Sequence, residues 1–315
     1  MTTDSAPSIP DEVQALANER ASARAERDWA ASDALRDRIA ELGWVVTDAP
    51  DGFRLAPRPP FDVVPTIRDL PQGLAAHARC AMVVLVDGWP DDTATCLSAL
   101  VAHAPDDVVV VAVDLGDVDG AGRVVHALAE EHPTRIVELH VATPLAQAGW
   151  GPTVAAAIAA CASPLVGVMD MSSVLDGDAL TPILSEFDDA SVVASGWRGV
   201  DVNVDDAWRS FVDAAPGEVD ALLGYLLVVR RDAAVATPPH PKARFYRNAD
   251  MEWSLALRTA GGRLTMPAGD LPVHQERHHG YHDSDPERRD RESKKTYDRL
   301  LAAYRGKDAI LRPRP

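Results

Sequence analysis

Residues 81–100, AMVVLVDGWPDDTATCLSAL, begin with a short apolar run, continue through a polar turn and end in an amphipathic helical pattern. The same order starts again at residues 108–122, VVVVAVDLGDVDGAG. Runs without alternation are typical of strands buried on both faces, because a strand with one solvated face would alternate apolar and polar residues. The two segments therefore predict an α/β domain with a mostly parallel sheet.

Four more apolar runs continue this pattern along the chain. They are RIVELHV at residues 135–141, PLVGVM at 164–169, ASVVAS at 190–195 and GYLLVV at 224–229. Amphipathic stretches at residues 92–104 and 121–131 supply helices, which cover both faces of such a sheet. We expect this domain to occupy residues 78–305, including a mixed-charge helix from residue 285, with a tail at residues 306–315.

The segment before the sheet has a different pattern. From residue 11 to residue 42 apolar positions recur at helical spacing without an internal proline, and Gly43 supplies a stop signal. Residues 44–46 and 53–55 flank a Pro-Asp-Gly turn, which predicts a small hairpin. The proline-rich stretch after it is typical of a linker. The sequence thus predicts a helix plus hairpin module at residues 1–57 and a linker at residues 58–77.

The charge balance limits the classes of partner. The 315 residues include 31 Lys and Arg against 48 Asp and Glu, a formal net charge of −17, which disfavours nucleic acid or an anionic membrane as partner. No stretch reaches the ~18 apolar residues of a membrane span, and no signal-peptide pattern opens the chain. Three widely spaced cysteines argue against a disulfide framework. We expect a soluble, cytoplasmic protein.

Acidic side chains follow three of the predicted strands. Asp87, Asp114 and Asp170 each stand at the carboxyl end of an apolar run, where open parallel sheets bind their ligands. A carboxylate there can accept hydrogen bonds from a base or a sugar. The alternative is an ordinary turn rich in Asp and Gly.

More oxygen ligands follow Asp170 in the segment DMSSVLDGD, residues 170–178. Such side chains can hold a divalent cation, Mn²⁺ or Mg²⁺, that neutralises a diphosphate. Alternatively, Asp176 and Asp178 cap the helix predicted directly after them.

A second polar region lies between residues 248 and 292. Asp250 and Glu252 open a predicted helix, where they serve either chemistry or capping. Histidines follow a short strand at positions 274, 278, 279 and 282, and they either bind metal or belong to a solvated loop. The arginines at positions 277, 288, 289 and 291 either bind phosphate or, because acids are interleaved with them, form a solvated helix face.

In this order the segments resemble the family 2 glycosyltransferases, enzymes of the GT-A fold that use nucleotide sugars, across about residues 78–305. The resemblance implies that Asp87 lies in the first nucleotide-facing loop and that Asp114 contacts the nucleotide base. Residues 149–173, GWGPTVAAAIAACASPLVGVMDMSS, match the approach to the family's Asp-x-Asp motif, with Asp170 as its first acid. Residues 248–275, NADMEWSLALRTAGGRLTMPAGDLPVHQ, match the segment of the catalytic base.

The resemblance makes Asp250 the catalytic base and His274 a histidine that can join the metal shell. The chain departs from the family at the Asp-x-Asp motif, which reads Asp170-Met171-Ser172. A hydroxyl brings no negative charge to a hard cation. Three alternatives follow: Asp170 and His274 hold the ion together with the donor phosphates, the enzyme works without metal, or the activity has been lost.

Residues 16–56 have a separate resemblance, to the extreme carboxyl-terminal piece of cysteinyl-tRNA synthetases. The motifs that match are Asp28-Trp29-Ala30, Ser32-Asp33, Gly43 and the turn Asp48-x-Pro50-x-Gly52. The catalytic and zinc-binding parts of such an enzyme are absent, which excludes aminoacylation. We favour docking or formation of a homo-oligomer over RNA contact, because the segment has no clear basic excess.

The leading hypothesis is an inverting transfer of a sugar from a nucleotide-diphosphate donor to an acceptor hydroxyl, with Asp250 as general base. The donor would be held by Asp87, Asp114, Asp170 and Ser172, assisted by a cation where one binds. The alternative is a non-catalytic GT-A-like binding module, which the loss of the second acid at Ser172 favours. Sugar transfer onto tRNA has only the amino-terminal resemblance in its favour, and the net charge opposes it.

Overall fold

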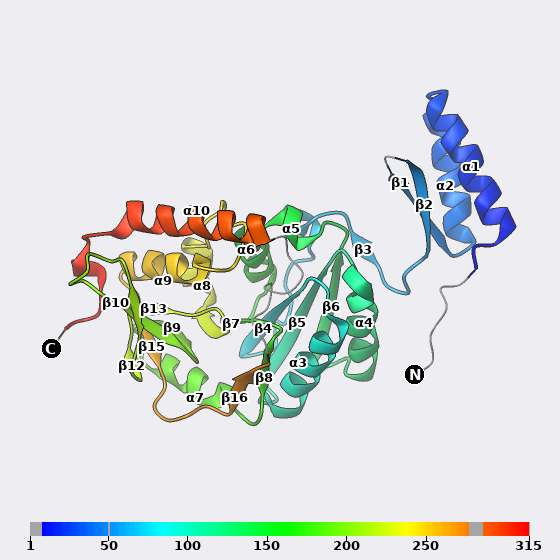
Figure 1. The fold of residues 1–315 in the computed structure, drawn as a ribbon. Helices are drawn as coiled ribbons and strands as arrows, with labels where there is room; N and C mark the ends of the chain where they lie inside the picture. Colours follow the sequence, from blue (N-terminus) through cyan, green and yellow to red (C-terminus); the bar gives the residue numbers. More distant parts are fainter. Residues whose placement is uncertain (1–7, 50, 277–285, 315) are drawn as a thin grey trace. The chain divides into compact units, whose positions relative to one another are not determined.

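The computed structural model describes residues 8–49, 51–276 and 286–314. The chain divides into two compact units, Met1–Pro60 and Phe61–Pro315. Each unit has an apolar core of its own. Figure 1 traces the helices and strands of both units. The division falls inside the segment that the sequence predicts as a linker, and residues 1–57 and 78–305 stay the predicted bounds of the two domains.

The first unit pairs two helices with a β-hairpin. Its helices are α1 (Asp11–Ala25) and α2 (Trp29–Glu41), and its antiparallel strands are β1 (Trp44–Ala49) and β2 (Gly52–Pro57). The core of this unit consists of Val13, Ala17, Ile39, Trp44 and Val46. The predicted hairpin is confirmed.

The continuous helical pattern expected from residue 11 to residue 42 is interrupted once. Arg27 has a φ of 62°, in the left-handed region, which ends the first helix. The side chain of Asp28 accepts a hydrogen bond of 3.0 Å from the backbone N–H of Ala31 and so caps α2. The apolar spacing hides this break because both helices face the same core, and Asp28 is the signal that the prediction missed.

The second unit contains a nine-stranded sheet with the order β12-β15-β9-β14-β7-β4-β5-β6-β3. Along the chain its strands are β3 (Val63–Val64), β4 (Cys80–Val86), β5 (Val108–Leu115), β6 (Ile136–Val141), β7 (Leu165–Met169), β9 (Val192–Gly196), β12 (Gly217–Glu218), β14 (Leu226–Arg230) and β15 (Arg263–Met266). Strands β3 to β7 are parallel, whereas β14 runs antiparallel between β7 and β9. All six apolar runs are confirmed as strands of a mostly parallel sheet.

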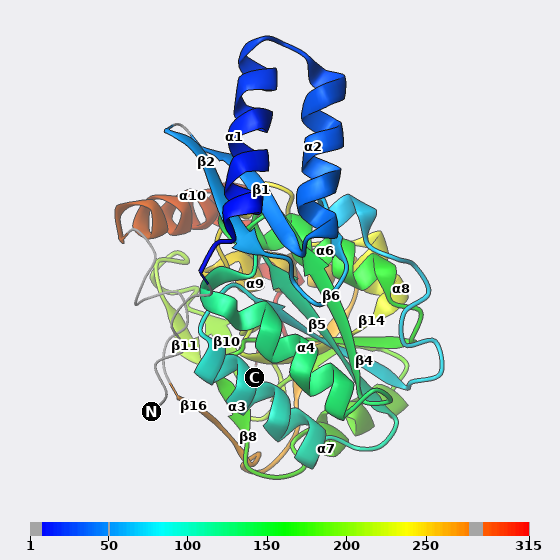
Figure 2. The same ribbon diagram turned by 90° about the vertical axis from the view of Figure 1, so that its right-hand side faces the viewer.

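Helices cover both faces of this sheet (Figure 2). They are α3 (Pro90–His103), α4 (Ala121–Glu131), α5 (Leu145–Ala148), α6 (Trp150–Ala160), α7 (Leu180–Ser185), α8 (Arg231–Ala236), α9 (Ala249–Thr259) and α10 (Pro286–Tyr304). Along β4, Val83 and Leu85 pack into the core under α6 and α9, and Met82 and Val84 into the core under α3 and α4. This double burial explains why the strands lack alternation.

Two small sheets complete the unit. Strands β8 (Ser173–Leu175) and β16 (Val273–Gln275) form an antiparallel pair, and β10 (Gly199–Val202) pairs with β11 (Phe211–Asp213) and β13 (Ala221–Leu222). Helix α10 lies alongside α9 (Figure 1). After α10 the chain is bound to β10 and the turn before β13, because Arg312 pairs with Asp201 and Arg314 with Asp220. The sequence predicts residues 306–315 only as a tail.

The three cysteines, Cys80, Cys96 and Cys161, are buried and free. None of the helices in the described ranges combines the length and the apolar character that a membrane span requires.

Candidate active site

The sheet has a topological switch point between β4 and β7. From β4 the chain adds β5 and β6 on one side and then returns to place β7 on the other. A crevice opens at the carboxyl ends of the strands where the winding direction reverses. Asp87 follows β4 and Asp170 follows β7, so two of the predicted acids lie at this point.

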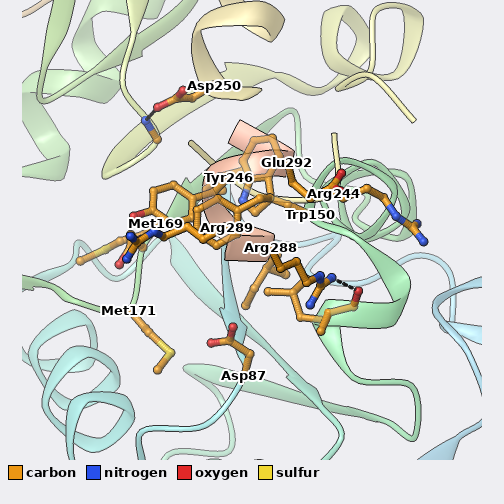
Figure 3. A pocket seen from close by; sticks show the side chains of 17 residues that line it. Asp87, Trp150, Met169, Met171, Arg244, Tyr246, Asp250, Arg288, Arg289 and Glu292 are labelled. Atoms are coloured by element: carbon orange, nitrogen blue, oxygen red, sulfur yellow. Dashed lines mark hydrogen bonds between the residues drawn. The ribbon is translucent and has the colours of Figure 1, made fainter. Parts of the chain in front are cut away.

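A cavity at the switch point brings three predicted acids together. Asp87, Asp170 and Asp250 all line it, as Figure 3 shows for Asp87 and Asp250. Its other charged lining residues are Arg244, Arg288, Arg289 and Glu292, and its aromatic ones are Trp150, Phe245 and Tyr246. The predicted site residues Asp114, Ser172 and His274 are described by the structure but do not line this cavity.

Asp250 is a buried acid whose two carboxylate oxygens both accept hydrogen bonds. It is the second residue of α9 and is 8% exposed. Its Oδ2 accepts a hydrogen bond of 2.8 Å from the backbone N–H of Gly224, and its Oδ1 accepts one of 2.8 Å from that of Met251. Burial raises the pKa of Asp250 to about 6, and the charge of Asp170 acts in the same direction. A carboxyl group with this pKa is ionised at neutral pH and still basic enough to accept a proton.

Asp170 and Ser172 bind each other. Asp170 Oδ1 accepts the backbone N–H of Ser172 at 2.8 Å and its hydroxyl at 2.6 Å. The Ser172 hydroxyl, which has no exposed surface, in turn accepts a hydrogen bond of 3.3 Å from the side-chain amide of Gln275. Ser172, which stands in place of the second motif acid, therefore orients Asp170 and does not itself line the cavity.

Asp114 belongs to a buried chain of acids and histidines. It is 1% exposed, and its Oδ2 lies 2.9 Å from Nδ1 of His140. The other ring nitrogen of His140 lies 2.8 Å from Glu138, and Phe61 stacks on the ring with 3.6 Å between centroids. Burial acts to lower the pKa of His140, but Asp114 and Glu138 outweigh it and the pKa is raised. The carboxylate of Asp114 is thus paired inside the protein.

His274 also has its ring nitrogens engaged. Nδ1 lies 2.7 Å from Asp176 and Nε2 lies 3.1 Å from Glu276, and these two carboxylates raise the pKa of His274. Since neighbouring strand residues point to opposite faces, His274 faces away from the side on which Gln275 contacts Ser172. The structure therefore does not bring His274 into contact with Asp170.

The capping interpretation is confirmed for Asp178 and wrong for Asp176. Asp178 accepts hydrogen bonds from the backbone N–H groups of Leu180 at 3.1 Å and Thr181 at 2.9 Å, in the first turn of α7. Asp176 is bonded to His274 instead. Glu252, the second acid of α9, pairs with Arg299 of α10.

Nothing in the arrangement of these donors fits a divalent cation well. Within the described ranges no three His, Cys, Asp or Glu side chains are grouped so as to hold a metal ion. The Ser172 hydroxyl donates to Asp170 and accepts from Gln275, and both ring nitrogens of His274 lie within hydrogen-bond distance of carboxylates. Asp170 and His274 stay the predicted metal ligands.

The cavity contains arginines for which the sequence left two roles open, phosphate binding and a solvated helix face. Arg288 and Arg289 extend from the start of α10 and in Figure 3 they lie between Asp250 and Asp87. Arg288 donates a hydrogen bond to the backbone carbonyl of Ala146. Both residues line the cavity, and the side chain of Arg289 is 16% exposed, whereas that of Arg291 is 56% exposed. Arg277 and the histidines at positions 278, 279 and 282 lie outside the described residues.

The sequence singled out none of the lining residues Trp150, Arg244 and Tyr246 individually, although Arg244 and Tyr246 belong to residues 238–247, a loop that it offers as a candidate for acceptor contacts. Trp150 starts α6, and the other two precede α9. No spacing or motif marks them, because they reach the cavity through loop conformation. Only their proximity in sequence to α6 and Asp250 was a signal.

This mostly parallel α/β sheet, with its cavity at the switch point, has the GT-A fold. Residues 82–271 match the model of the family described as glycosyltransferase like family 2. This match covers more than half of the chain, and the protein belongs to that family.

Solved glycosyltransferases share the fold. The mannosyltransferase PcManGT from Pyrobaculum calidifontis, solved with GDP-Man and Mn²⁺, aligns over 78% of this chain and 78% of its own with a TM-score of 0.51 and 16% identity. GalNAc-T7, solved with UDP, GalNAc and Mn²⁺, aligns over 71% of this chain and 48% of its own with a TM-score of 0.55 and 12% identity. At these identities the likeness establishes the fold alone.

The first unit matches a different family. Residues 6–53 match the cysteinyl-tRNA ligase anticodon binding domain. Cysteine–tRNA ligase 1 of Burkholderia lata is 51% identical over 47 residues, which are 15% of this chain and 10% of that protein. The cysteine–tRNA ligase of Chlamydia caviae is 50% identical over 44 residues, or 14% of this chain and 9% of its own. The chain thus spans about a tenth of the length of these curated relatives.

Proposed function

We propose that the second unit transfers a sugar from a nucleotide-diphosphate donor to an acceptor hydroxyl with inversion at the anomeric carbon. The observation that supports this most is Asp250, a buried carboxylate with a pKa of about 6 in the switch-point cavity. As general base it takes the proton of the acceptor hydroxyl while the oxygen attacks the anomeric carbon and the diphosphate leaves from the opposite side. One bond forms, one breaks, and the proton ends on Asp250 Oδ.

In this proposal some of the other acids bind the donor and others hold the protein's own residues in place. Asp87 and Asp170 line the cavity and accept hydrogen bonds from the donor. Ser172 orients Asp170 through two hydrogen bonds. Asp114, which the family resemblance assigns to the nucleotide base, is paired with His140, and we assign it to holding the β5 and β6 ends together.

A donor panel tests the proposal. The full-length protein is mixed with UDP-, GDP- and dTDP-sugars, with and without Mn²⁺, and release of free nucleoside diphosphate is followed together with binding. We expect turnover with at least one donor and loss of turnover, with binding retained, in Asp250→Asn. Failure of every donor to bind would sink the proposal.

The second candidate is a binding module without turnover, and the observation in its favour is that the position of the second motif acid holds the uncharged Ser172 hydroxyl, which is bonded to Asp170 and Gln275. The same panel separates the two functions. A donor that binds without turnover, with equal affinity for the wild type and Asp250→Asn, would establish the module.

For the first unit we propose docking or self-association and not RNA binding. Residues 11–60 contain 7 Arg and 10 Asp and Glu, so their formal balance is 7 − 10 = −3. Contact with RNA depends on neutralising phosphates, which this balance opposes. We expect no tRNA binding by fluorescence anisotropy at 150 mM salt, and a salt-resistant complex would contradict the proposal.

A further inference from the structure

We propose that Arg288 and Arg289 of α10, together with Arg244, bind the diphosphate of the donor directly, and that this binding requires no divalent cation. The inference rests on the proposed function and specifies how its leaving group is held. It differs from the state of both solved neighbours, whose structures contain Mn²⁺.

The first argument is that the acids near the switch point are already occupied by protein donors. Oδ1 of Asp170 accepts two hydrogen bonds from Ser172. Both carboxylate oxygens of Asp250 accept backbone N–H groups. A hard cation needs several free oxygen ligands at once, and these two acids each offer fewer than a free carboxylate does.

The second argument is the charge that lines the cavity. Four carboxylates, Asp87, Asp170, Asp250 and Glu292, face a space that would also have to accept an anionic diphosphate. Without positive charge such a site would repel the donor. The arginines at positions 244, 288 and 289 line the same space, and guanidinium groups bind phosphate oxygens through pairs of parallel hydrogen bonds.

The third argument is that α10 is fixed against the element that bears Asp250. Arg299 of α10 donates hydrogen bonds of 2.5 and 2.6 Å to Glu252, which stands two residues after Asp250 on α9. Asn248, directly before α9, donates a hydrogen bond of 3.1 Å to the backbone carbonyl of Ser293. The start of α10 is also tied to α5, through Arg288 and Ala146. The guanidinium groups are therefore placed in a defined position relative to the base, as stabilisation of a leaving group requires.

Calorimetric titration of the full-length protein with UDP, GDP and inorganic pyrophosphate tests the inference. Each titration is run in EDTA and again in Mn²⁺. We expect at least one nucleoside diphosphate to bind in EDTA, with an affinity that Mn²⁺ changes by less than about threefold. The double variant Arg288→Gln/Arg289→Gln should weaken this binding by about 10-fold or more, because charge-assisted hydrogen bonds are lost.

Lys294→Gln is the matched control, since Lys294 belongs to the same helix, pairs with Asp298 on the surface and does not line the cavity. It should change the affinity by less than about twofold. Binding that appears only with Mn²⁺, or an equal loss in the control, would overturn the inference and leave the proposed function standing. Absence of nucleotide binding under both conditions would overturn the proposed function itself. The wild-type comparison between EDTA and Mn²⁺ decides the matter even where the double variant fails to fold.

Discussion

Arg299 and Glu252 form a two-point ion pair between α10 and α9, with N–O distances of 2.5 and 2.6 Å. The Glu252 side chain is only 5% exposed, and that of Arg299 is 20% exposed. The pair links the helix that lines the cavity with arginine to the helix that begins with Asp250. It is a positioning contact, since neither residue lines the cavity.

Arg299→Met should lower the free energy of unfolding by about 3 kcal/mol, because it leaves a buried carboxylate without its partner. Urea unfolding at pH 7 measures the change. Lys294→Met on the same helix is the control: Lys294 pairs with Asp298 on the surface, and its loss should cost less than about 0.5 kcal/mol. Equal effects of the two substitutions would show that the Arg299–Glu252 pair has no special weight.

Asp250→Asn should lower turnover of the productive donor by about 10²- to 10⁴-fold, the usual contribution of a general base. The base must be ionised to accept a proton, so kcat/KM of the wild type should rise with pH and level off above a pKa of about 6. Initial rates between pH 5 and pH 8 give this profile. A flat profile would exclude Asp250 as the base.

Asp250 also predicts a pH dependence of stability that needs no substrate. Its pKa is about 6 in the folded protein, against 3.8 for an unperturbed Asp, so between these values the folded state binds more protons than the unfolded state. Stability from this group is therefore present at low pH and lost as the pH rises toward 6. Asp250→Asn lacks this titration. The unfolding free energy of the wild type should therefore fall by about 1 kcal/mol more than that of Asp250→Asn between pH 5 and pH 7.5. Urea unfolding of both proteins at the two pH values measures this difference.

The buried pair of Asp114 and His140 should be strongly coupled. His140 has a raised pKa, so its contribution is present below the unfolded pKa of 6.5 and is lost as the pH rises through the folded value. A double-mutant cycle of Asp114→Asn and His140→Gln at pH 6 should give a coupling free energy of about 1–3 kcal/mol. A smaller coupling at pH 9 is the expected companion result. Additive effects at both pH values would contradict the pairing.

The strands were predictable because each is buried on both faces. A run such as residues 108–113 cannot be placed at a surface, so composition alone determines its location. The pairs β8–β16 and β10–β13 could not be predicted in the same way, since short strands depend on contacts with distant segments. The break at Asp28 was hidden for the opposite reason: both helices bury apolar residues in one core, so the spacing continues across the turn.

The acids at the carboxyl ends of the strands could also be predicted from the sequence. Asp87 and Asp170 line the same cavity because the carboxyl ends of neighbouring parallel strands lie at one edge, and this placement could be predicted from the sequence. The arginines at positions 288 and 289 could not be assigned, because alternation of Arg with acids along α10 does not reveal which face turns inward. That face is fixed by Glu252 and Asn248, which belong to another helix.

Ser172→Asp tests how far the motif position decides metal use. The new carboxylate would face Asp170 in a place with no exposed surface, where Ser172 now donates a hydrogen bond of 2.6 Å. Two close carboxylates repel each other, so we expect a loss of about 2–4 kcal/mol in unfolding free energy in EDTA. A cation that binds the pair should restore stability, by about 2.7 kcal/mol at one hundred times its Kd. Thermal unfolding with increasing Mn²⁺ should therefore raise the Tm of the variant and leave that of the wild type unchanged, whereas a Mn²⁺-dependent Tm of the wild type would show that the serine-containing site already holds the ion.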